Sequence, residues 1–381
     1  MKEIHIKEGP FIKTKNKASN IMNNLLIALV PIILFAVYKN GYLLYKNDQT
    51  DVFGIFYPLI FILVSMFTSI LTEYLYTIII KKEKNVTLKN NIKTTFSLFP
   101  GLFLALISSI NTPIWLLILG SFLATILGKL LWGGLGHNKI NPALVGHILI
   151  VLIMSILIKD GSNYLNTLEQ SKFQSLPLTD ATKIVGTYDN LVKPFGNLWD
   201  FFFGVIPGGV GNTSVFLTII AFLYLVYKKA LKWIIPLTYI GTVFIVTYFI
   251  GFLNGIGIWY SLFQILTGGL VFGAVFMATD PVTSPTTETA QVVYGMSLGI
   301  LTIIFRFIVP TIEAVAISIL IMNLVVGVLD KIGAQARFEF KKISILILAE
   351  LIIILGLSLY IAENKKLTIN VNHETQESKI S

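Results

Sequence analysis

The sequence predicts an all-α, polytopic membrane protein with about ten transmembrane helices in two five-helix halves, plus one extra C-terminal helix. Of its 381 residues, 55% are hydrophobic and only 13% are charged, against about 25% charged residues in a typical soluble domain. Apolar runs near the length of about 20 residues that an α-helix needs to cross a bilayer recur along the chain. The runs are continuous rather than alternating, which argues against a β-barrel.

The expected elements follow in order. Residues 1–20 form a basic, cytoplasmic N-terminal segment with no small-residue cleavage site after it, so the first helix is expected to remain in the protein. The first half, residues 21–158, contains expected spans at 21–37, 53–80, 91–110, 113–132 and 143–158. The second half, residues 201–330, contains expected spans at 214–227, 231–253, 259–278, 292–310 and 311–329. Residues 331–363 form a linker and an additional span at 343–362, and residues 364–381 form a polar tail.

A polar loop, residues 159–200, separates the two halves and is rich in Ser, Thr, Asn, Asp and Lys. Loops of this length are usually functional or disordered. Because five is an odd number, a repeated five-helix unit would have the opposite orientation in the membrane, as in inverted repeats. With the N-terminus in the cytoplasm, 19 lysines and arginines lie on the cytoplasmic side and nine lie outside. This distribution predicts a cytoplasmic N-terminus and an extracytoplasmic loop in the cytoplasmic (inner) membrane.

Composition also excludes several classes of site. The chain has no cysteine, so thiolate-ligated iron–sulfur clusters would have to belong to partner proteins. Its four histidines show no metal-ligand spacing, and no metal site is expected. The net charge of +9 lies in loops beside the spans, which indicates topology signals next to membrane lipid rather than nucleic-acid binding.

Three polar stretches, the first two of them Gly-rich, lie at 128–143, 207–214 and 277–285, and each joins the end of one helix to the start of another. They are compatible with tight interhelical turns and equally with free helix N-termini that bind a phosphate, a carboxylate or a flavin ring. A small-xxx-small pair, Gly269 and Gly273, predicts close helix packing.

Charged residues inside spans are costly, so each needs a partner or a function. Glu73 is expected to reach water or a lysine at the cytoplasmic end of its span, and Arg306 is expected to pair with Glu313 on the next span. Glu350, in the additional helix, has no assigned role.

Thr182 by itself is a loop threonine with no neighbouring base to activate its hydroxyl, so any modification would need a separate enzyme. Its significance comes from a resemblance carried by residues along most of the chain. These are Gly9-Pro10-Phe11-Ile12, Gly133-Gly134-Leu135-Gly136, Asn141-Pro142-Ala143, Gly211-Asn212-Thr213-Ser214, Phe276 to Pro285, Tyr294-Gly295 and Arg306. Through these residues the chain resembles the NqrB/RnfD family, and more closely its RnfD branch.

In that family, FMN is joined through its phosphate to a threonine in a motif resembling Asp-x-x-Ser/Thr-Gly-Ala-Thr. The resemblance implies a phosphoester of FMN on Thr182, with Thr179 and Ala181 also matching the motif. Leu176 and Asp180 depart from it. Asp180 places a carboxylate beside the incoming phosphate, where like charges repel.

The resemblance further implies a subunit of an Rnf-type complex rather than a stand-alone enzyme. Electrons would pass through flavin between iron–sulfur and FMN-bearing partner subunits and drive Na⁺ or H⁺ across the membrane, and a flavin transferase would attach the FMN. A further flavin, such as riboflavin, is expected within the membrane near Asn141, Asp280 and Thr283. The alternatives are a secondary transporter or channel without redox activity, and a scaffold that has lost its flavin.

Overall fold

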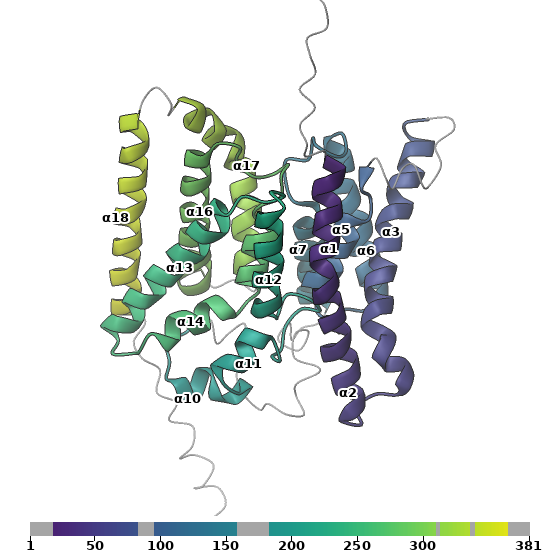
Figure 1. Ribbon diagram of the computed structural model, residues 1–381, viewed down its shortest axis with the longest axis horizontal. Coiled ribbons are helices and arrows are strands. Elements are labelled where there is room, and N and C mark those ends of the chain that lie inside the picture. The colour runs from purple at the N-terminus through teal and green to yellow at the C-terminus, as the bar shows by residue number, and fades with distance from the viewer. Residues whose placement is uncertain (1–17, 83–94, 158–182, 310–312, 336–339, 365–381) are drawn as a thin grey trace, which may run out of the picture.

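The computed structural model describes residues 18–82, 95–157, 183–309, 313–335 and 340–364 (Figure 1). Over these ranges the chain forms helices and no β-strand, so the all-α prediction is confirmed. Seven of the described helices are long and apolar enough to cross a membrane, or eight if one bent pair counts as a single span. The protein is a multi-pass membrane protein. The expected count of about ten spans is not confirmed within the described ranges.

The first half begins with α1 (Ala18–Val37), which continues through a π-helical turn into α2 (Leu43–Lys46). A short 3-10 turn precedes α3 (Tyr57–Ile79), where Pro58 lies in the first turn, a position that tolerates its missing N–H group. The remaining helices of this half are α5 (Phe99–Ile107), α6 (Ile114–Gly128) and α7 (Pro142–Leu157).

Helix α5 is much shorter than the expected span at 91–110. Its nine residues extend about 13 Å, less than half of the roughly 30 Å of a hydrocarbon core. The helix ends where the sequence becomes polar, at Ser108. Two carbonyls at this end are satisfied by the loop before α12, because Val210 N donates to Ser108 O at 2.9 Å and Gly211 N donates to Leu106 O at 2.7 Å.

Two short helices, α10 (Tyr188–Leu191) and α11 (Leu198–Phe203), lead from the loop into the second half. It continues with α12 (Val215–Tyr227), α13 (Ile234–Leu253), α14 (Trp259–Leu266), α15 (Leu270–Phe272), α16 (Glu288–Ile303) and α17 (Ala314–Gln335). Ser214 caps α12 by accepting a hydrogen bond from Leu217 N. Helix α18 (Phe340–Asn364) lies at one edge of the molecule, and α3 lies near the other (Figure 1).

The expected span at 259–278 is broken into two helices. Helices α14 and α15 meet at an angle of 61°, because Gly268 and Gly269 adopt φ values of +66° and +64°. These values lie in the left-handed region that glycine occupies without steric cost. A Cβ atom on Gly273 would lie 2.7 Å from Val315 Cγ1 on α17, so this glycine permits the close packing expected of it.

The packing order of the first half recurs in the second. Helix α3 packs on α5 and α6, and α6 packs on α7; likewise α13 packs on α14 and α16, and α16 packs on α17. The halves run in opposite directions, because α1 and α12 are antiparallel: Tyr224 OH donates to Asn24 Oδ1 at 3.3 Å, while Lys39 Nζ donates to Thr213 Oγ1 at 3.1 Å. The arrangement is that of an inverted repeat.

The two ends of the helix bundle differ. Helices α2, α10 and α11 lie at one end, and the N-terminal end of α1 lies at the other (Figure 1). The connection from α12 to α13 lies at the same end as the start of α1, since Tyr224 contacts Asn24. The bundle therefore has an N-terminal face and an opposite face from which the 183–203 segment extends.

Candidate functional site between the two halves

The turn before α7 caps the start of that helix and also forms hydrogen bonds with the second half. Asn141 Oδ1 accepts hydrogen bonds from Ala143 N at 3.1 Å and Leu144 N at 3.4 Å, which satisfies two of the otherwise unpaired N–H groups at the start of α7. Asn141 N donates to Asn323 Oδ1 on α17 at 3.0 Å, and Asn141 Nδ2 contacts Met277 Sδ at 3.6 Å. This Gly-rich turn is thus joined to two elements of the other half.

The turn after the broken helix is organised by Asp280. Its carboxylate accepts hydrogen bonds from Val282 N at 3.2 Å and from Thr283 Oγ1 at 3.3 Å. Thr283 O in turn accepts from Asn323 Nδ2 at 3.0 Å. Burial raises the pKa of Asp280 above the ordinary aspartate value, and its hydrogen bonds from Val282 N and Thr283 Oγ1 lower that pKa in part.

Asn323 connects the two turns and was not identified from the sequence. It bonds to Asn141 N and to Thr283 O, and its Nδ2 also lies 3.1 Å from Tyr294 OH. The sequence does contain a signal for it, because an asparagine lies in the middle of the apolar helix α17. A buried amide without hydrogen-bond partners would be costly there.

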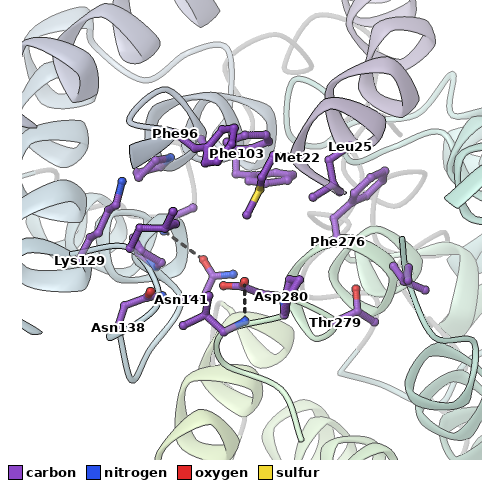
Figure 2. Close-up of a pocket in the computed structure, with 18 of the residues that line it drawn as sticks. Met22, Leu25, Phe96, Phe103, Lys129, Asn138, Asn141, Phe276, Thr279 and Asp280 are labelled. Carbon is purple, nitrogen blue, oxygen red and sulfur yellow. Dashed lines mark hydrogen bonds between the residues drawn. The ribbon is translucent and has the colours of Figure 1, made fainter. Parts of the chain in front are cut away.

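A pocket opens between these turns, with an empty space of about 770 Å³ that includes part of its open mouth. Asn141 and Asp280 lie on one side of the cavity, with Phe96, Phe103 and Met22 across from them (Figure 2). Thr283 lies behind Asp280 and is not part of the lining.

The pocket draws its lining from both halves of the chain. Aromatic and apolar side chains from α1, α5, α12 and the segment before α16 form most of the wall, and Asn138, Asn141, Thr279, Asp280 and Lys129 are its polar members. Leu225, Ala230 and Leu231 also line it, so it lies toward the N-terminal face, where α12 connects to α13.

Lys129 is the partner that Glu73 was expected to find. Its Nζ lies 2.7 Å from Glu73 Oε2, and each side chain is 3% exposed. Nζ also donates to Thr95 O at 2.6 Å. The expectation that Glu73 pairs with a lysine at that end of the span is confirmed.

The expected ion pair between Arg306 and Glu313 is wrong. Arg306 donates instead to Gln264 O at 2.6 Å and Gln264 Oε1 at 2.9 Å, and to Thr267 O at 3.3 Å. Glu313 lies beside His147 of α7, with 3.2 Å between Glu313 Oε1 and His147 Nε2. Arg306 lies in a π-helical turn at Ile304–Ile308. Such a turn changes the direction of its side chains relative to a regular α-helix.

Comparison with known sequences identifies the family. A family model described as the NQR2, RnfD, RnfE family matches residues 5–339. The chain belongs to this family. The family match includes both turns and the whole lining of the pocket, whereas α18 lies beyond its end.

Individual relatives extend over nearly the whole chain. The chain is 31% identical over 341 residues to a subunit of a proton-translocating ferredoxin:NAD(+) oxidoreductase complex from Clostridium ljungdahlii, covering 88% of this chain and 96% of the relative. It is 28% identical over 344 residues to a subunit of a Na(+)-translocating ferredoxin:NAD(+) oxidoreductase complex from Acetobacterium woodii, covering 89% and 96%. It is 30% identical over 249 residues to a subunit of a Na(+)-translocating NADH-quinone reductase from Chromohalobacter salexigens, covering 62% and 57%.

The segment expected to carry the covalent flavin, Thr179, Asp180, Ala181 and Thr182, lies outside the described residues. The chain leaves the described structure after the end of α7 and returns at Lys183, shortly before α10. Helix α10 lies on the face opposite the start of α1 (Figure 1), whereas the pocket lies toward the N-terminal face.

Proposed function

We propose that this protein is the membrane subunit of an ion-translocating ferredoxin:NAD⁺ oxidoreductase complex of the Rnf type. It carries electrons through flavin while the complex moves Na⁺ or H⁺, and its partners are iron–sulfur and FMN-bearing subunits. The observation that carries the proposal is the near full-length similarity to subunits of two such complexes. One of these relatives is named for protons and the other for sodium, so the proposal covers both ions.

The pocket between the halves supports a bound flavin. A flavin ring is flat and aromatic, with carbonyl and N–H groups along one edge. Phe96, Phe103 and Phe276 offer faces for stacking, and the Asn141 and Asp280 side offers polar groups for the ring edge. The flavin, when bound, supplies one- and two-electron transfer. These residues orient the ring and exclude water from it.

Filling the pocket tests this assignment. Met22 lines the pocket from α1, so Met22→Trp is expected to occupy ring volume and weaken non-covalent flavin binding at least about tenfold, a loss of about 1.4 kcal/mol. The matched control is Ile27→Trp on the same helix, because Ile27 is 55% exposed on the outer surface. Flavin released by denaturing the purified complex is measured for each variant. Equal flavin in Met22→Trp and Ile27→Trp would reject the pocket as the site.

The second flavin of the proposal is FMN joined by a phosphoester to Thr182. It is supported by the match of Thr179, Ala181 and Thr182 to the family motif. We expect the protein made with a flavin transferase to give a fluorescent band on a denaturing gel, and Thr182→Ala to remove it. Thr167→Ala, in the same loop but outside the motif, is expected to keep the fluorescence.

A dark wild-type band in the presence of an active transferase would reject the phosphoester. It would leave the family and the non-covalent site untouched, because those are tested by flavin released from the complex.

The proposal places the protein in the cytoplasmic membrane with its N-terminus inside and the 159–200 loop outside. It is supported by the excess of lysine and arginine on the N-terminal side. The chain contains no cysteine, so single cysteines report topology without a background. We expect a membrane-impermeant maleimide added to intact cells to label Glu169→Cys and to spare Lys228→Cys, and the reverse pattern would invert the topology.

A further inference from the structure

Helix α18 adds a carboxylic acid to the middle of the membrane-spanning bundle. It lies beyond residue 339, where the family match ends, and its 25 residues extend about 37 Å. Glu350 lies near its midpoint and is 8% exposed, so the side chain faces the protein rather than the lipid. Helix α18 packs on α13 and α16.

The contacts of Glu350 are few. Ser297 Oγ of α16 donates a hydrogen bond to Glu350 Oε1 at 2.5 Å. The second oxygen, Oε2, is buried and has no hydrogen-bond partner among the described residues. The Ser297 hydroxyl is therefore the one hydrogen-bond partner of this carboxyl group among the described residues.

The helices packed against α18 bring no compensating charge to Glu350. The titratable residues of α13 are Tyr239 and Tyr248, and Tyr239 OH is already bonded to Thr302 Oγ1. On α16 and its π-helical end, Glu288 and Arg306 lie nine residues before and after Ser297, about 13 Å away along the axis in each direction. Tyr294 OH lies beside Asn323, and Arg306 is bonded to Gln264 and Thr267.

On α18 itself, the other titratable residues are at least eight positions from Glu350 in the sequence. Lys342 precedes Glu350 by eight residues, about 12 Å along the helix, and Lys341 lies one residue further. Tyr360 and Glu363 follow by ten and 13 residues, about 15 and 20 Å. No ion pair involving Glu350 is present in the described part of the chain.

A carboxylate in this position would lose its hydration without gaining a cation. A charged side chain at the centre of a membrane-spanning helix is costly, and one hydroxyl donor replaces only part of the lost hydration. The neutral acid removes the charge and keeps the bond from Ser297. The geometry thus favours the form that holds a proton.

We propose that Glu350 is a proton-binding site within the membrane, occupied as a neutral carboxylic acid, on a helix that lies beyond the residues matched by the family model. The reaction is the addition of one proton to one carboxylate, with no electron transferred. The site is separate from the pocket, whose lining contains no residue of α16 or α18. Loss of the proton leaves a buried, unpaired charge between α18 and α16, so proton binding stabilises their contact.

Infrared spectroscopy of the full-length protein in lipid tests the protonation state directly. At neutral pH, the difference spectrum between wild type and Glu350→Gln is expected to show the carbonyl band of a neutral carboxylic acid, shifted in D₂O. Glu363→Gln, on the exposed end of the same helix, is expected to leave that band in place. Ser297→Ala is expected to move its frequency, because the hydrogen bond to Oε1 is lost.

Two outcomes would overturn the proposal. One is a difference spectrum in which Glu350→Gln removes a carboxylate band instead of a carboxylic-acid band. The other is disappearance of the acid band when NaCl replaces KCl at constant pH, because the site would then take a sodium ion. Glu350→Gln keeps the size and shape of the side chain, and the folded state of each variant is checked by its elution as a monodisperse species.

Discussion

Replacing Glu73 by Gln is expected to destabilise the folded protein by about 3–5 kcal/mol, the usual cost of removing one partner of a buried ion pair. The ammonium of Lys129 is 2.7 Å from Glu73 Oε2, and both side chains are 3% exposed. In the variant, this ammonium keeps its bond to Thr95 O but loses its counter-charge. The free energy of unfolding is measured by denaturant titration in detergent.

The double variant Glu73→Gln/Lys129→Met provides the matched comparison. It removes both charges, so it is expected to recover most of the lost stability and to give a coupling energy well above zero. Lys81→Met, an exposed lysine beyond the end of the same helix, is expected to change stability by less than about 0.5 kcal/mol. A Glu73→Gln variant as stable as Lys81→Met would show that the pair does not support the fold.

The Glu73–Lys129 pair belongs to a regular series between α3 and α6. Ser65 Oγ lies 2.7 Å from Ser121 Oγ, and Thr125 Oγ1 donates to Ser69 Oγ at 3.1 Å. In each pair the second residue follows the first by 56 positions, so the two helices run parallel in constant register. Spans of this kind are evident from hydropathy, and the need of Glu73 for a partner follows from its cost in lipid. The register between α3 and α6 cannot be predicted in this way, because it depends on how two helices that are distant in the sequence pack against each other.

In the candidate site too, single residues can be predicted from the sequence but their contacts across the fold cannot. Asn141 and Asp280 could be proposed from the sequence because each lies at a break between helices. Asn141 follows a Gly-rich stretch and Asp280 directly precedes a proline. The structure brings both residues to one pocket. The sequence marks Asn323 only as a polar residue in an apolar helix, and its partners are set by where α17 crosses the two turns. The expected Arg306–Glu313 pair failed because proximity along the chain does not fix the direction of side chains on either side of a π-helical turn.

Replacing Arg306 by Met is expected to destabilise the protein by about 2–4 kcal/mol, because it removes the hydrogen bonds of a buried guanidinium, and hydrogen bonds to charged groups contribute about 1.5–3 kcal/mol each. Arg306 donates to Gln264 O and Thr267 O, which are at the C-terminal end of α14 and the break that follows it. Both residues are fully buried beside the 61° bend, and Thr267 O also accepts a hydrogen bond from Leu270 N at 3.5 Å. The guanidinium therefore stabilises the broken helix that leads to Asp280.

The variant Arg306→Lys distinguishes the effect of the positive charge on stability from the effect of the guanidinium's hydrogen-bond geometry. A lysine keeps the positive charge near the end of α14 but has one compact ammonium in place of a planar fork of donors, so we expect it to restore about half of the stability lost in Arg306→Met. Hydrogen exchange is expected to rise at the amides of Gly268 to Leu270 in Arg306→Met and less in Arg306→Lys. Full stability of Arg306→Lys would mean that charge alone holds the bend, and full stability of Arg306→Met would mean that the bend is held by Gly268 and Gly269 without the guanidinium.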